Sequence, residues 1–71
     1  MFDYSKLRGL IVEKYGTCTA FAAKAGWTPG QLSARLTNKT PFTSDEIVKV
    51  KDLLGIDPDQ IAAYFFTLAV R

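Results

Sequence analysis

Two short helical patterns joined by a tight turn constrain the fold of this chain more than any other feature. Residues 17–38 read TCTAFAAKAGWTPGQLSARLTN, and Gly26 is placed to end the first helix. The second helix has a clear start, because Thr28 is a good N-cap residue and Pro29 occupies the first helical position, where no N–H is needed. Gln31, three residues after the cap, completes a capping box. A helix, a tight turn with glycine and a second helix predict a helix-turn-helix.

The rest of the chain carries the same kind of helix signals. Thr43 and Glu46 form a second capping box, and residues 57–60 repeat the cap and proline pattern. Apolar residues recur at helical spacing before and after the central motif. We therefore expect helices over about residues 4–15, 19–25, 29–37 and 44–54, with a fifth after residue 57. This pattern predicts an all-α fold, a compact bundle of about five short helices in a single domain over residues 1–71.

Composition excludes several classes of function. Seventy-one residues make one small domain near the lower limit for an independent core, so a dimer would help it. The chain has no histidine and one cysteine, Cys18, which rules out an intrachain disulfide, a Cys/His zinc site and a histidine-based catalytic triad. The sequence shows no paired carboxylates, no nucleophile with a base and no glycine-rich phosphate loop. We expect a protein that is not an enzyme and has no cofactor or metal.

Cysteine usage and hydropathy also suggest a location. A lone thiol fits a reducing cytoplasm, and the N-terminus lacks the basic and apolar layout of a signal peptide. The longest mainly apolar run, residues 61–70, is too short to span a bilayer. We expect a cytoplasmic protein with no membrane partner.

The charges are distributed unevenly along the chain. The formal net charge is +2 overall, but residues 1–39 carry six basic and two acidic side chains, whereas residues 40–71 carry three basic and five acidic ones. The half that contains the helix-turn-helix is therefore the positive half, as a phosphate-facing surface requires. An ordinary solvated surface with chance asymmetry is the alternative interpretation.

The motif resembles the Cro/CI-type helix-turn-helix domains of phage and bacterial repressors. The matching residues are Phe21, Ala22, Gly26, Thr28, Leu32, Ser33 and Leu36. Within that family the chain is most similar to small Cro-like or repressor-modulator proteins from the lysogeny switches of Gram-positive phages. This similarity rests on residues 2–8, 26–27, 32–33, 41–43 and 64–66. The resemblance covers nearly the full chain and implies a lambda-repressor-like DNA-binding domain.

The resemblance implies a repressor that binds double-stranded operator DNA, with its second helix in the major groove. By position, the candidates for base contact are Thr28, Gln31, Ala34 and Arg35. The candidates for phosphate contact are Thr17, Thr19, Asn38, Lys39 and Thr40. The chain departs from the family at Pro29, Gly30 and Ala34, where no side chain can donate a hydrogen bond to a base.

Small residues on a helix face also let another protein approach closely. Gly30, Ala34 and Thr37 therefore support the alternative implied by the resemblance, an antirepressor or modulator that binds the N-terminal domain of the cognate phage repressor.

The last residues, 61–71, are apolar on almost every side of a helix, which suggests a partner site and a homodimer. Residues 66–70 permit a strand instead, and a helix absorbed into the domain's own core is the other alternative. The interface candidates are Tyr64, Phe65, Phe66, Leu68 and Val70.

Overall fold

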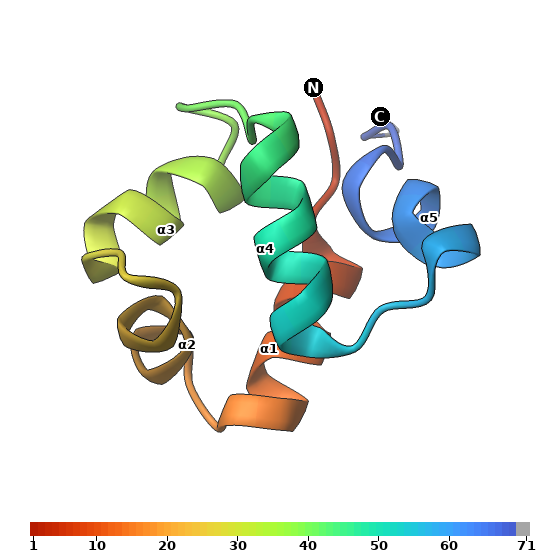
Figure 1. Cartoon of the computed structure of the whole chain (residues 1–71). Helices are drawn as coiled ribbons and strands as arrows, with labels where there is room; N and C mark the ends of the chain where they lie inside the picture. Colours follow the sequence, from red (N-terminus) through yellow and green to blue (C-terminus); the bar gives the residue numbers. More distant parts are fainter. Residues whose placement is uncertain (70–71) are drawn as a thin grey trace.

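A computed structural model of the chain describes residues 1–69. Over these residues the elements are α1 (Ser5–Tyr15), α2 (Cys18–Ala25), α3 (Pro29–Leu36), α4 (Ser44–Leu54), the single 3-10 turn η1 (Pro58–Gln60) and α5 (Ile61–Phe65). In Figure 1, α2 and α3 lie on one side, α1 and α4 in the middle and α5 on the other side. The predicted all-α fold with five helices is confirmed.

The predicted capping boxes set the starts of α3 and α4. The Thr28 hydroxyl accepts a hydrogen bond from Gln31 N at 3.2 Å, and Gln31 Oε1 accepts one from Thr28 N at 2.9 Å. Thr43 and Glu46 make the same reciprocal pair, at 3.2 and 3.0 Å. The similar signal at residues 57–60 does not form a box. Asp57 makes no side-chain cap, and the segment closes as the 3-10 turn η1 before α5 starts.

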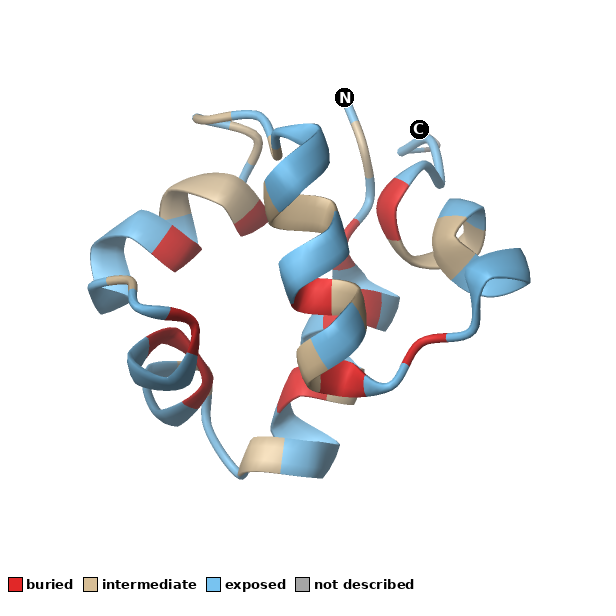
Figure 2. Ribbon diagram, viewed as in Figure 1, coloured by how far each residue is buried: buried red, intermediate tan, exposed pale blue. Residues whose placement is uncertain are grey.

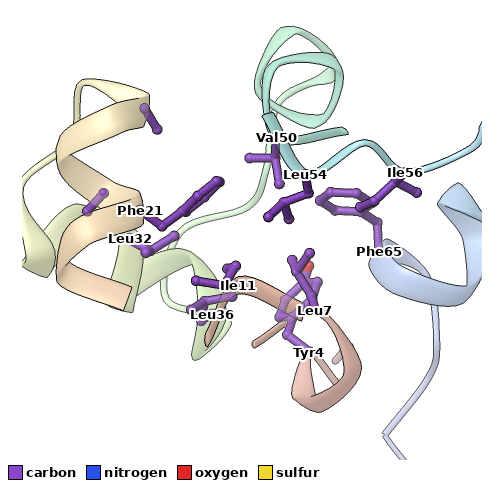
Figure 3. Close-up of a cluster of buried hydrophobic side chains, with 12 residues drawn as sticks. Tyr4, Leu7, Ile11, Phe21, Leu32, Leu36, Val50, Leu54, Ile56 and Phe65 are labelled. Carbon is purple, nitrogen blue, oxygen red and sulfur yellow. The ribbon is translucent and has the colours of Figure 1, made fainter. Parts of the chain in front are cut away.

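The core lies where all five helices meet. In Figure 3, Phe21 and Leu32 come from the side of α2 and α3 and Phe65 from α5, with side chains of α1 and α4 between them. Complete burial of such side chains contributes about 1.5–3 kcal/mol each. The buried residues are Tyr4, Leu7, Ile11, Phe21, Ala22, Ala25, Leu32, Leu36, Val50, Leu54, Ile56 and Phe65.

The two ends of the described chain lie side by side (Figure 1). Phe2 and Leu68 form an isolated antiparallel bridge. Asp3 N donates to Thr67 O at 2.7 Å, and Ala69 N donates to Met1 O at 3.1 Å. The helix α5 therefore stops at Phe65, and the chain then leaves helical geometry. The sequence leaves both a helix and a strand open for residues 66–70. Over residues 66–69 the chain is not helical, and Leu68 forms this single bridge; residue 70 lies outside the described residues.

None of the helices in residues 1–69 combines the length and the apolar character needed to cross a bilayer.

Candidate partner-binding surfaces

The first candidate surface is the outward face of α3. Leu32 and Leu36 are buried against the core, while Thr28, Gly30 and Thr37 are exposed (Figure 2). Ala34 is half-buried. One face of α3 therefore packs against the core, and the opposite face is accessible to solvent, as contact with a macromolecule requires.

Arg35 points toward α4 rather than away from the protein. Its Nε and Nη2 donate to the two carboxylate oxygens of Glu46 at 3.0 and 2.8 Å, and its Nη1 donates to Gln31 O at 2.9 Å. The guanidinium carbon lies 4.7 Å from the ring centroid of Trp27, and the side chain is 14% exposed. Three of the five guanidinium N–H donors are thus used within the protein, and they hold the side chain against α4 rather than in the outward position that the predicted base contact needs.

This ion pair also shifts the pKa of both of its members. The hydrogen bonds from Arg35 hold the pKa of Glu46 below its usual value, and the Thr43 backbone N–H and the nearby Lys49 act in the same direction. Hydrogen bonding to Glu46 raises the pKa of Arg35. Lys49 covers the Trp27 ring as well, with its Nζ 4.6 Å from the centroid. The turn between α2 and α3 is thus fastened to α4 by charge-assisted contacts.

The other base-contact candidates have few free hydrogen-bonding groups to offer a base. Gln31 and Thr28 bond to each other within the capping box. The Thr37 hydroxyl donates to Ser33 O at 2.8 Å. Ala34 carries only a methyl group, and Pro29 and Gly30 have no polar side chain. The accessible face of α3 therefore carries mainly small side chains. Its longest polar side chains, Gln31 and Arg35, make hydrogen bonds within the protein.

The phosphate-contact candidates divide into two groups. Thr17 and Thr19 are exposed at the start of α2. The Thr17 hydroxyl caps this helix by accepting a hydrogen bond from Ala20 N at 3.1 Å. Lys39 is exposed in the loop after α3, and Thr40 is half-buried there. Figure 1 places the start of α2 and this loop at opposite ends of the pair formed by α2 and α3.

Asn38 is also in that loop, but its side chain points inward. Its Nδ2 donates to Phe2 O at 2.8 Å, and its Oδ1 accepts from Phe2 N at 3.0 Å. Both ends of the amide are occupied by the N-terminal backbone, so the structure does not place Asn38 for the predicted phosphate contact.

The second candidate surface is an apolar groove of about 360 Å³, which we call the aromatic groove. The loop after α3 forms one wall, and the first residues together with the end of α5 form the other. The ring centroid of Phe42 lies 5.3 Å from the ring centroid of Tyr4 and 5.3 Å from that of Phe65, and both pairs have edge-on geometry. The lining residues are Met1, Phe2, Tyr4, Asn38, Thr40, Pro41, Phe42, Ile47, Phe65 and Phe66.

The residues predicted for a C-terminal interface differ in their exposure. Phe65 is 1% exposed and belongs to the core, so it is not available to a partner. Phe66 and Leu68 are 49% and 66% exposed. Tyr64 is half-buried under the Lys6 ammonium, whose nitrogen lies 4.7 Å from the ring centroid. Val70 lies outside the described residues.

Sequence reasoning did not find the aromatic groove. Its walls come from four separate segments, and only the fold brings them together. The available signals were the isolated Phe42 in a polar loop and the aromatic residues at both ends of the chain. Each of these signals predicts burial as readily as a binding surface.

Comparisons with known proteins identify the family. A family model described as "Protein of unknown function (DUF739)" matches residues 1–68. The chain belongs to this family. A search of curated proteins gives no match.

This DUF739 protein is also similar to a solved structure, the modulator of repression (MOR) of the temperate bacteriophage TP901-1 from Lactococcus lactis. The two share 38% sequence identity and superpose with a TM-score of 0.83, over 99% of this chain and 95% of the modulator. The predicted similarity to phage repressor modulators is therefore confirmed. The comparison does not extend to operator binding or to a homodimer.

Proposed function

We propose that this protein is a modulator of phage repression that acts by binding the N-terminal domain of a repressor protein. The observation that carries this proposal is the match to the TP901-1 modulator, which has 38% identical residues over almost the whole length of both chains. The groove and the α3 face both lie within the matched region.

The geometry of α3 supports protein binding over base reading. Specific recognition of a base pair uses long donor or acceptor side chains such as Arg, Gln and Asn in the major groove. In this protein Arg35 is paired with Glu46, and Gln31 caps its own helix. What the helix presents to its surroundings is instead Gly30, Ala34 and Thr37, the face predicted for a protein partner.

The aromatic groove is the part of the surface best suited to hold a repressor domain. Binding energy in protein interfaces is concentrated in aromatic and large apolar side chains that fill pockets, surrounded by a polar rim. Phe66 and Met1 stand at this groove with about half and three quarters of their surface exposed. We place the main contact here and keep the α3 face as a second candidate.

The test is titration calorimetry with the purified N-terminal domain of the cognate phage repressor. We expect a complex that Phe66→Ala weakens by about tenfold or more, as loss of an aromatic anchor predicts. Val48→Ala, on an exposed position of α4 outside the groove, is the matched control. Gly30→Leu distinguishes the surfaces, because it weakens binding only if the α3 face takes part.

Operator binding is the competing function, and the positive charge of residues 1–39 favours it. A reader of DNA loses affinity steeply with salt, and Lys39→Ala should reduce both the affinity and the salt slope. Salt-dependent binding of this protein alone to its promoter DNA, together with no measurable binding to the repressor domain, would overturn the proposal.

A further inference from the structure

Asn38 has a backbone conformation and a hydrogen-bond pattern that set it apart. Its φ of 65° lies in the left-handed region, and it is the one non-glycine residue with positive φ among residues 1–69. That conformation costs free energy for most L residues, and asparagine tolerates it better than most. The amide uses it to reach Phe2, where it satisfies both the N–H and the C=O of a single residue.

The opposite edge of the same N-terminal segment is held by backbone pairing. The bonds from Asp3 N to Thr67 O and from Ala69 N to Met1 O flank Phe2 on the side of residues 67–69. Residues 1–3 therefore lie between two hydrogen-bonding neighbours. On one side is the backbone of residues 67–69, and on the other is the Asn38 amide, which bonds to Phe2 as a neighbouring backbone would. We call residues 1–3 the N-terminal strap.

The strap forms part of the aromatic groove. Phe2 contacts Phe66 edge-on, with ring centroids 5.7 Å apart, and it lies 6.1 Å from Tyr4. Asn38 belongs to the wall formed by the loop after α3, whereas Phe2 and Phe66 belong to the opposite wall. The two hydrogen bonds of Asn38 therefore join the two walls and fix the distance between them.

We infer that Asn38 is a positioning residue for partner binding, which holds the strap so that Phe2 and Phe66 meet the partner at the correct spacing. This inference rests on the proposed function, in which the aromatic groove receives a repressor domain. Asparagine suits the position because one side chain supplies a donor and an acceptor together, and its short amide tolerates positive φ.

Two substitutions separate the amide from the backbone conformation. Asn38→Asp keeps the size and the tolerance of positive φ but replaces the donor by a second acceptor, which faces Phe2 O and repels it. Asn38→Gly removes the side chain and relieves the backbone cost. Val48→Ala, at an exposed position of α4 outside the groove, is the matched control.

Hydrogen exchange and binding are measured on the same variants. In both Asn38 variants we expect the Asp3 and Ala69 amides to exchange about tenfold faster, as the loss of one to two hydrogen bonds predicts, while core amides of α1 and α4 keep their protection. Affinity for the repressor N-terminal domain should fall by about the same factor. Val48→Ala should change neither quantity.

Each contrary result has its own meaning. Unchanged exchange at Asp3 and Ala69 would show that Asn38 does not hold the strap, and the inference would fail. Faster exchange with unaltered affinity would show a purely structural tie, and the inference would fail again. A wild-type protein that binds no repressor domain would instead refute the proposed function, and exchange alone would still decide whether Asn38 holds the strap.

Discussion

At the scale of single residues, the side chains that most resembled DNA readers are used to hold the protein together. Arg35, Gln31 and Asn38 are polar and lie in or just after α3, which is why the sequence predicts them as nucleic-acid contacts. Sequence alone could not show that Glu46 faces Arg35 across the α3–α4 loop, or that Phe2 returns to Asn38. Both pairings depend on tertiary placement, which has no local signal.

Acid sensitivity should follow from the Arg35–Glu46 pair. Because the folded state lowers the pKa of Glu46, the pair stabilises the protein above the unfolded pKa of about 4.3, and this stabilisation is lost as pH falls through the lower folded value. Urea unfolding at several pH values should show that Glu46→Gln is less stable than wild type near neutral pH, and that the difference narrows below about pH 4.

A double-mutant cycle provides the control for that measurement. In an Arg35→Met background, Glu46→Gln should have much less effect, because its partner is already missing. If Glu46→Gln loses as much stability at about pH 3 as at neutral pH, the Arg35–Glu46 pair is not the cause of the acid sensitivity.

At the scale of elements, local signals predicted most of the helices well. The starts of α3 and α4 agree with the structure because a reciprocal capping box is decided by residues three positions apart. Residues 57–60 carried a similar signal but form only the turn η1, because Asp57 makes no side-chain cap there. The end of α5 was ambiguous because Phe66 and the residues after it suit either a helix or a strand.

Within α1, Gly9 offers a test of helix propensity. It is exposed, and a Cβ added there would meet no atom within 4 Å. Gly9→Ala should therefore raise the free energy of unfolding by about 0.5–1 kcal/mol, because glycine loses more backbone entropy in a helix. Thermal unfolding followed by circular dichroism measures the change.

Gly26→Ala is the opposite control for that substitution. Gly26 ends α2 with φ of 82°, so an added Cβ is strained there whatever the free space. It should cost about 1–2 kcal/mol. Equal effects of the two substitutions would contradict this explanation.

At the scale of the whole molecule, helical periodicity and composition were enough to predict the fold class. The aromatic groove was not predictable in the same way, because its walls come from the first residues, the loop after α3, α4 and the end of α5. The C-terminal residues show the difficulty most directly. Adjacent phenylalanines were both assigned to a partner, but α5 turns Phe65 into the core and leaves Phe66 half exposed.

The two phenylalanines should respond very differently to truncation. Phe65→Ala removes a fully buried ring and should cost about 3–5 kcal/mol, most of the stability of so small a domain. Phe66→Ala loses mainly the edge-on contact with Phe2 and should cost about 1 kcal/mol. Urea unfolding followed by fluorescence of the single tryptophan, Trp27, measures both changes. Similar losses at the two positions would contradict this assignment.

The pairing of Phe2 with Leu68 also affects how the protein is made. The ribosome adds residues 67–69 long after the strap, so the growing chain exposes Phe2 without its neighbour until they emerge. The aromatic groove therefore cannot be completed cotranslationally before that point. Nascent chains that end before residue 67 would carry α2 and α3 but lack the finished groove.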